Sequence, residues 1–328
     1  MIKIIAEAAT CHAGDVDLGK QLILMAAAAG ADTIKFQHIV PHQLYVPHSK
    51  ASGERVTNPV IQNRMAERLS DLDLQVLKHF ADEVGIEFAL TLFDIESLEL
   101  VSILDLHFVK IASGDLNYFA FLEKIRGLEV PVLLSTGMAS MPEISATIKV
   151  LAPKNACDLT LLHCVSVYPC PPNLINLSRI SELKEFGYKV GFSDHSLGEW
   201  AASAAVALGS SVIEKHIRLE NGPKTADFDH SMTEAEFTKF VKSIRNVELG
   251  MLENPAGLSD EEILVKKRAR RGMYANKDLP AGHIIAQSDL AFLRPENDFS
   301  PTMSLEVVGK KLLKMIEKGD PVGRSDFQ

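Results

Sequence analysis

The chain has 328 residues, 46% of them hydrophobic and 23% charged, which is typical of a globular protein with a packed core. Its net charge of −9 argues against non-specific binding to nucleic acid or to an anionic membrane surface. No apolar run approaches the roughly 18 residues of a membrane span. The first residues already follow a strand pattern, so we expect no signal peptide. Cys11, Cys157, Cys164 and Cys170 lack metal-site spacing, so we expect reduced thiols in a cytoplasmic protein.

Short apolar runs alternate with helical patterns along most of the chain. The runs lack strict polar alternation, which indicates strands buried on both faces. They lie at residues 2–7, 32–37, 86–93, 107–111, 130–135, 159–164, 190–195 and 212–216. Patterns with the helical period stand between most of them, at residues 18–29, 71–84, 96–104, 119–128, 141–151 and 200–209. A long polar segment, residues 38–70, interrupts the alternation and has a length that is usually associated with function or disorder.

This alternation predicts the fold class. Eight strand–helix units in about 250 residues are the signature of a (β/α)8 TIM barrel. The alternative is an open doubly wound sheet, but such sheets often carry a Gly-rich first turn and no GxGxxG is present. Thr233 and Glu236 form a capping box that opens the last barrel helix. We expect a catalytic barrel over residues 1–250, a linker over 251–269 and a small second domain over 270–328, which should dock on something because it is near the lower size limit for independent folding.

Polar residues stand at the C-terminal end of nearly every predicted strand, where TIM barrels build their active sites. They are Glu7, Lys35, Gln37, Lys110, Ser113, Ser135, Ser166, Tyr168, Ser193, His195, Glu214, Lys215 and His216. A lysine at the end of a buried strand needs a counter-anion or a solvent cavity. Lys35 and Lys110, together with the serines, Thr136 and exposed backbone N–H groups, therefore predict a site for phosphate and carboxylate. The alternative is that each lysine sits at the rim and reaches water.

His195 and His216 end the two strands of one strand–helix–strand unit, so they are expected side by side. Two histidines are few for a closed zinc site. They suit an open site for Mn²⁺, Mg²⁺ or Co²⁺ that keeps positions for water and a substrate oxygen. Glu214 lies two residues before His216, so its side chain points the same way and can bind a metal-coordinated water. The alternative is a pair of unrelated histidines, one in the core and one at the surface.

Several segments, in order along nearly the whole chain, resemble the motifs of the sialic acid synthase family. They are KIIAEAATCHAGDVDLGKQLILMAAAAGADTIKFQ, KIASGDLNYFAFLEKI, LLSTGMAS, LLHCVSVYPCPPNLINL, GFSDHSLG and VIEKHIRLENGPKTADFDHSM. The segment RRGMYANKDLPAGHIIAQSDLAFLRPENDFSP resembles that family's C-terminal antifreeze-like (SAF) domain. The chain departs from the family at Cys11, where Asn is usual, and before Asp227, where Gly-Pro is usual, so Asp229 is an alternative to Asp227.

The resemblance implies a metal-dependent synthase of sialic acid-type sugars for surface glycans. Such enzymes condense phosphoenolpyruvate with the open-chain aldehyde of an N-acylated hexosamine, here N-acetylmannosamine or a diacetamido-trideoxyhexose. The products are a nine-carbon 2-keto acid and phosphate. The resemblance also implies a homodimer in which the SAF domain reaches into the active site of the partner by domain swapping.

The resemblance also implies a role for individual residues of the matching motifs. The expected metal ligands are His195 and His216, and Glu7 or Glu214 is expected to assist the addition of water. The residues that resemble phosphoenolpyruvate contacts are Lys35, Lys110, Ser113, Ser135, Ser166 and Ser193. The residues that resemble sugar contacts are Glu7, Gln37, Tyr168 and Asp227. Arg294 resembles the SAF-domain arginine that reaches the acylamino group from the other subunit.

Three alternative functions stay open at this point. One is the same reaction on an N-acylhexosamine 6-phosphate. Another is a Schiff-base aldolase of the same fold, which would use Lys35, Lys110 or Lys215 and no metal. The last is a non-catalytic sugar- or ice-binding protein, which the SAF resemblance alone suggests and which the polar strand ends argue against.

Overall fold

The computed structural model describes residues 1–51, 54–152, 158–252 and 257–327. The described residues form two compact units, Met1–Met251 and Leu252–Gln328, each with its own hydrophobic core.

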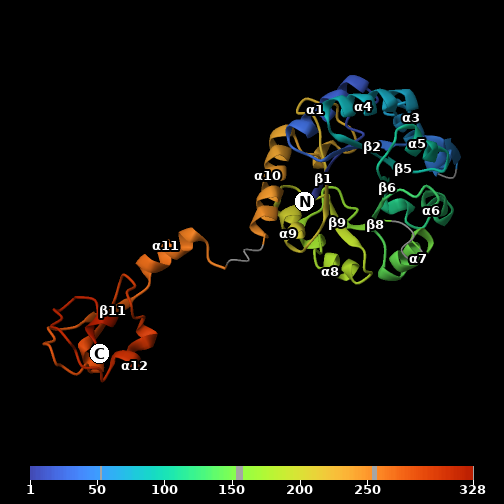
Figure 1. Ribbon diagram of the computed structural model, residues 1–328. Coiled ribbons are helices and arrows are strands. Elements are labelled where there is room, and N and C mark those ends of the chain that lie inside the picture. Colours follow the sequence, from blue (N-terminus) through green and yellow to red (C-terminus); the bar gives the residue numbers. More distant parts are fainter. Residues whose placement is uncertain (52–53, 153–157, 253–256, 328) are drawn as a thin grey trace. The chain divides into compact units, whose positions relative to one another are not determined.

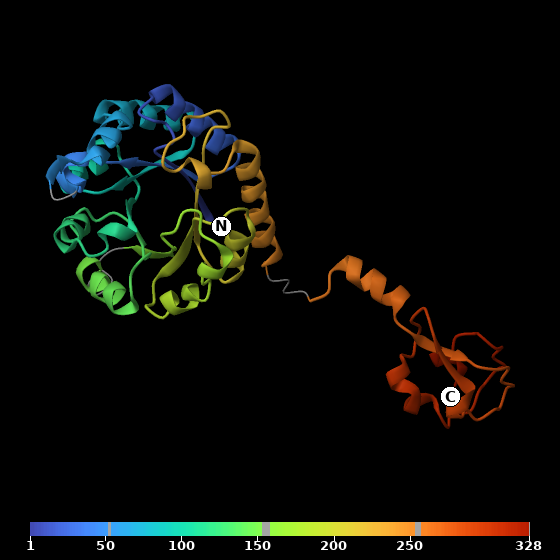
Figure 2. The same ribbon diagram turned by 180° about the vertical axis from the view of Figure 1, so that it is seen from behind.

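Among the described residues of the first unit, eight parallel strands close into a barrel (Figures 1 and 2). Their order around the barrel is β1-β10-β9-β8-β7-β6-β5-β2, and β1 pairs with both β10 and β2 to complete the ring. The bounds are β1 Lys3–Ala9, β2 Thr33–His38, β5 Glu87–Leu92, β6 Val109–Ile111, β7 Val132–Ser135, β8 Leu159–His163, β9 Lys189–Asp194 and β10 Val212–His216. The predicted TIM barrel is confirmed, and an open sheet is wrong because the ring leaves no edge strand.

Helices surround this barrel, and capping side chains set where several of them begin. At the start of α4 (Asp71–Val84), Ser70 and Asp73 form a reciprocal capping box. Thr233 and Glu236 form the predicted capping box at the start of α10 (Glu234–Gly250). Each box satisfies backbone amides that the first helical turn leaves unpaired. The other helices of this unit are α1 Val16–Ala28, α2 Pro41–Leu44, α3 Pro59–Ala66, α5 Leu100–Ile103, α6 Phe119–Arg126, α7 Met141–Leu151, α8 Arg179–Lys184 and α9 Trp200–Ala207.

The structure differs from the predicted elements in three places. The polar segment 38–70 has its own elements, namely α2, a hairpin of β3 (His48–Ala51) and β4 (Glu54–Thr57), and α3. Helix α8 was not predicted. The helical segment 96–104 divides into a 3₁₀ turn, Glu96–Glu99, followed by α5. Short elements such as these lack the several turns that a periodic pattern needs to stand out.

The core of the first unit has two layers. A large outer layer packs the strands against the surrounding helices. A small inner layer fills the barrel and consists of Ile5, Ala89, Phe108, Leu133, Leu162 and Val212. Side chains two positions apart on a strand share a face, so the residues two positions further along these segments also point toward the barrel interior. That next layer is where the polar strand ends meet.

The second unit contains helix α11 (Asp260–Ala269), the antiparallel pair β11 (Gly272–Ala275) and β12 (Leu290–Leu293), and helix α12 (Ser304–Val307). Its core gathers apolar side chains from the whole length of the unit after α11, from Met273 to Phe327. A core of its own is the requirement for a separate folding unit.

Cys11, Cys164 and Cys170 are free and buried, whereas Cys157 lies outside the described residues. Among the helices that the structure describes, none combines the length and the apolar character needed to cross a membrane.

Candidate active site

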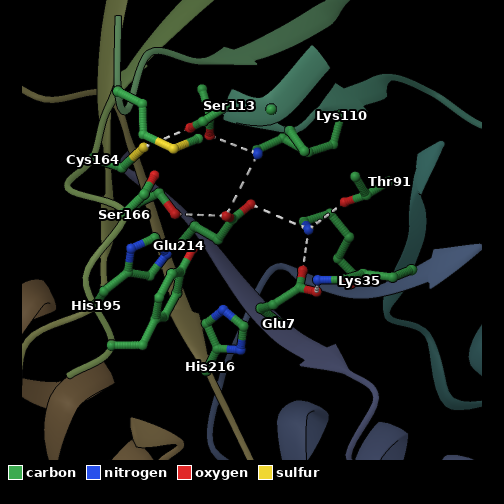
Figure 3. Close-up of a pocket in the computed structure, with 17 residues that line it drawn as sticks. Glu7, Lys35, Thr91, Lys110, Ser113, Cys164, Ser166, His195, Glu214 and His216 are labelled. Carbon is green, nitrogen blue, oxygen red and sulfur yellow. Dashed lines mark hydrogen bonds and ion pairs between the residues drawn. The ribbon is translucent and has the colours of Figure 1, made fainter. Parts of the chain in front are cut away.

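An open cavity lies at the C-terminal ends of the barrel strands (Figure 3). Its walls contain every barrel residue of the predicted site except Thr136, Lys215 and Asp227: Glu7, Lys35, Gln37, Lys110, Ser113, Ser135, Ser166, Tyr168, Ser193, His195, Glu214 and His216. Residues that the sequence did not single out also line it, namely Thr91, Ala112, Gly114, Met138 and Cys164. Thr91 lies two residues before the end of the predicted strand 86–93, so a search for polar residues near strand ends could have found it.

A buried lysine joins two carboxylates at the floor of this cavity. Figure 3 shows Lys35 between Glu7 and Glu214, and its Nζ forms ion pairs with both, the second at 3.4 Å. The same Nζ donates a hydrogen bond to Thr91 Oγ1 at 2.8 Å. Gln37 Nε2 donates to Glu7 Oε1 at 3.1 Å. The register accounts for this arrangement, because Lys35 is level with Glu7 on the neighbouring strand.

Lys110 extends the charged group along the cavity wall. Its Nζ donates to Ser135 Oγ at 2.7 Å and lies 3.8 Å from Glu214 Oε1. Ser193 Oγ donates to the same Glu214 oxygen at 2.7 Å. Glu214 therefore stands between two lysines and also accepts a hydrogen bond from a hydroxyl group.

The two carboxyl groups have opposite pKa shifts. Burial raises the pKa of Glu7 to about 7, against the opposing attraction of Lys35. Burial also acts on Glu214, but Lys110, Lys35 and the Ser193 hydroxyl outweigh it and lower the pKa of this carboxyl to about 2. The two carboxylates raise the pKa of Lys35 above its ordinary value despite its burial. Near neutral pH the cavity thus holds one ionised carboxylate and one that exchanges a proton, a pattern typical of acid–base sites.

A wall of hydroxyl groups gathers around Gly137, just past β7. The Gly137 N–H donates to Ser113 Oγ at 3.0 Å. A Cβ at this position would lie 2.5 Å from Ser166 Oγ and 2.8 Å from Ser113 Oγ, so glycine is needed for the two serines to approach. Lys110 and Ser135 adjoin this wall in the cavity. Lysine and hydroxyl donors in one place suit a phosphate or carboxylate group.

The two predicted histidines lie side by side, with ring centres 5.7 Å apart. His195 Nδ1 lies 2.8 Å from the carbonyl oxygen of Val165, so this nitrogen carries the proton and leaves Nε2 with a free lone pair. Burial lowers the pKa of His195 to about 4 and that of His216 to about 3. Both rings are therefore neutral at pH 7, as metal ligands must be. The ring of Tyr168 lies 4.2 Å from that of His195.

His216 also belongs to a group that sequence reasoning missed. The ligand atoms of His216, Asp227 and His230 all lie within 4.8 Å of one another, a spacing that can hold a metal ion. Asp227 Oδ2 accepts a hydrogen bond from Thr10 Oγ1 at 2.7 Å. The sequence offered only a weak signal for His230, an Asp-x-x-His spacing that matches no common metal motif.

Lys215 and Asp229 do not line this cavity. Lys215 was expected beside the histidines. Instead its Nζ bonds to Asp194 Oδ2 at 2.9 Å and lies over the ring of Phe240, because it alternates with Glu214 and His216 along β10. Asp229 is exposed and lines a different cavity. Arg294 is exposed on the second unit, and its role stays a prediction.

Replacing Lys35 by Met should destabilise the first unit by about 3–5 kcal/mol, since two buried carboxylates lose their shared cation. Without Lys35 the pKa of Glu7 rises further above its unfolded value. The raised pKa of Glu7 then leaves the free energy of unfolding unchanged below about pH 4.5, where Glu7 is protonated in both states. It lowers that free energy progressively as the pH rises above this value. Urea unfolding should therefore show a larger loss at pH 8 than at pH 5.

Lys189→Met is the matched control, because Lys189 and Asp158 form an exposed ion pair. Such a pair contributes at most about 1 kcal/mol. A loss from Lys35→Met that equals the control, or that does not change with pH, would contradict the buried-charge account.

Comparisons with known proteins show which family the chain resembles. Residues 22–254 match the model of the NeuB family, and residues 270–328 match that of the SAF domain. The chain is 36% identical to the N,N'-diacetyllegionaminic acid synthase of Campylobacter jejuni, over 94% of each chain. It is 34% identical to an uncharacterized protein of Methanocaldococcus jannaschii, over 99% of this chain and 94% of the relative.

Among solved structures, the chain is similar to the N-acetylneuraminic acid (sialic acid) synthetase of Leptospira borgpetersenii in complex with citrate. The TM-score is 0.70 and the identity 29%, covering 81% of this chain and 90% of that one. The family match spans most of the barrel, and the family resemblance in the sequence motifs is confirmed. The chain belongs to the NeuB family of sialic, legionaminic and pseudaminic acid synthases and carries a C-terminal SAF domain.

Proposed function

We propose that the protein condenses phosphoenolpyruvate with an open-chain N-acylated hexosamine to give a nine-carbon 2-keto acid and phosphate. The observation that carries this proposal is the union of two features in one cavity. Lysines and serines that suit an anionic substrate stand opposite two neutral histidines that suit a divalent metal. Family membership favours the same reaction class.

The anion half of the cavity fits phosphoenolpyruvate. Lys35 and Lys110 face one ionised carboxylate, Glu214, so the surplus positive charge attracts an anion while Glu7 is protonated. Ser113, Ser135, Ser166 and Ser193 add hydroxyl donors from four different strand ends. We assign the phosphate and carboxylate of phosphoenolpyruvate to this wall.

The histidine half fits a divalent metal. His195 presents an unprotonated Nε2, His216 is neutral, and the buried His216 Nδ1 has no hydrogen-bond partner among the described residues. Mn²⁺, Co²⁺ or Mg²⁺ held there would act as a Lewis acid that polarises the aldehyde oxygen of the acceptor. Gln37 and Tyr168, which also line the cavity, are proposed to orient the acceptor sugar.

The proposed reaction balances without an oxidant or reductant. Carbon C3 of phosphoenolpyruvate forms a bond to the aldehyde carbon, and the aldehyde oxygen takes up a proton. Water adds at C2, loses a proton, and the tetrahedral species releases phosphate by cleavage of the C–O bond. Glu7, with a pKa near 7, is the group suited to give and take protons here. Glu214 stays ionised and holds both lysines and Ser193 in place.

The homodimer, the swapped SAF domain, the contact from Arg294 and the cytoplasmic location stay predictions from the family resemblance. The acceptor is the part of the function that most needs an experiment.

Phosphate release from phosphoenolpyruvate, measured with each acceptor in turn, tests the proposal. The acceptors are N-acetylmannosamine, its 6-phosphate and a 2,4-diacetamido-trideoxyhexose. We expect release that depends on one unphosphorylated N-acyl sugar, because the cavity already commits its lysines to phosphoenolpyruvate. Turnover with the 6-phosphate alone would favour the phosphorylated acceptor. Sugar binding without phosphate release from any acceptor would instead favour a non-catalytic protein.

Glu7→Gln should lower kcat by about 10²–10⁴-fold, the usual contribution of a positioned acid–base group. In the wild type, a limb of the pH–rate profile near pH 7 should belong to Glu7 and should disappear in the variant. Glu87→Gln is the control, because Glu87 pairs with Lys3 away from the cavity. An unchanged pH limb in Glu7→Gln would assign the proton transfer to another group.

Chelation separates this reaction from a Schiff-base aldolase. Removing divalent metal should abolish phosphate release, and Mn²⁺ or Co²⁺ should restore it. His195→Ala and His216→Ala should each lower activity by at least about a hundredfold, the scale expected when charge stabilisation in the transition state is lost. Activity that survives chelation, together with a borohydride-trapped substrate adduct on Lys35 or Lys110, would establish the aldolase.

A further inference from the structure

The chain that follows β10 returns to the barrel and brings a third histidine beside His216. His230 closes a short 3₁₀ turn, Phe228–His230, and its ring centre lies 4.7 Å from that of His216. Two imidazoles that bind one ion through nitrogens about 2.1 Å away place their ring centres roughly 4.5–5.5 Å apart, depending on the angle at the ion. The spacing of these two rings is therefore that of ligands to a common ion.

Unpartnered nitrogen atoms point to a ligand between these side chains. His216 Nδ1 and His230 Nε2 are buried and have no hydrogen-bond partner among the described residues. The residues themselves are 6% and 5% exposed. Leaving a buried polar atom unpaired costs about 1–3 kcal/mol, and two such atoms face one small group of ligand atoms. A cation would accept both lone pairs.

Asp227 contributes the negative charge that such a cation needs. Its Oδ2 accepts the hydrogen bond from Thr10, whereas its Oδ1 lies 3.6 Å from His230 Nε2, too far for a hydrogen bond. One carboxylate oxygen is thus anchored and the other stays free beside both imidazoles. The anchor fixes the carboxylate as an outer hydrogen bond fixes the ligands of many metal sites.

Backbone pairing holds this segment in register with β10. Met232 N donates to the carbonyl of His216 at 2.9 Å, and Arg218 N donates to the carbonyl of Met232 at 2.8 Å. The Ser231 hydroxyl donates to the carbonyl of Asp227 and closes the turn. Main-chain hydrogen bonds therefore fix the backbone position of His230 beside β10.

We propose that His230 and Asp227 bind a divalent metal ion together with His216. The set offers two imidazole nitrogens and one carboxylate oxygen, and it leaves positions for substrate or water. Imidazole ligands favour Co²⁺, Fe²⁺ or Zn²⁺, whereas Mg²⁺ prefers oxygen ligands. The proposal rests on the proposed function, shares His216 with its metal site and assigns the ion to transition metals rather than Mg²⁺.

Binding of Co²⁺ to the full-length, metal-free protein tests this assignment without any substrate. Visible absorption reports the coordination of Co²⁺, and competition with a chelator gives its Kd. His230→Gln and Asp227→Asn should each raise the Kd by more than about tenfold, since even outer partners of metal ligands have effects of that size. An excess of Mg²⁺ should not displace Co²⁺ from the wild type.

His163→Gln is the matched control, because His163 is a buried histidine whose Nε2 already contacts the Ile175 carbonyl at 2.7 Å. It should leave the Kd and the spectrum unchanged, and circular dichroism should confirm that each variant is folded. Wild-type affinity in both His230→Gln and Asp227→Asn, with loss of binding in His195→Gln, would overturn the proposal and leave the metal with His195 and His216. Because the assay uses metal alone, a failed condensation reaction would not alter its outcome.

Discussion

The candidate site depends on the buried contact of Lys35 with Glu7 and Glu214. A single charge inside the barrel would be strongly unfavourable, so these groups are tolerated only as a mutually neutralising set. The set has a chemical consequence, because Lys35 and Lys110 hold Glu214 ionised while burial lets Glu7 keep a proton. The buried charges are unfavourable for folding. The same charges provide an acid–base pair and an excess of positive charge for an anionic substrate.

The charged layer continues the apolar packing of the barrel. Each inner core residue is followed two positions later by a side chain of the cavity wall, such as Ile5 by Glu7 and Phe108 by Lys110. The other pairs are Ala89 and Thr91, Leu133 and Ser135, Leu162 and Cys164, and Val212 and Glu214. The apolar layer closes the barrel below the charges and excludes water from that side. Water and substrate can therefore reach the lysines only from the open C-terminal face.

Different parts of the chain build the two halves of the cavity. The segments that follow β6, β7 and β8 bring hydroxyl donors together around Gly137. The ring of Tyr168 lies within 5 Å of the rings of both His195 and His230. The end of β9 and β10 bring His195 and His216 to the cavity wall, and the segment after β10 places Asp227 and His230 beside His216. The departures from the family motif before Asp227 fall in that segment.

The sequence by itself determined the barrel and most of the cavity wall. Apolar runs specify the strands, and parallel pairing brings their C-terminal ends to one face, so Glu7, Lys35, Lys110 and Glu214 had to converge. Only the tertiary structure decided which carboxyl keeps its proton, because that depends on distances to both lysines. It alone placed His230 beside His216, since the long-range backbone pairing of Met232 with His216, and no local pattern, sets the path of that segment.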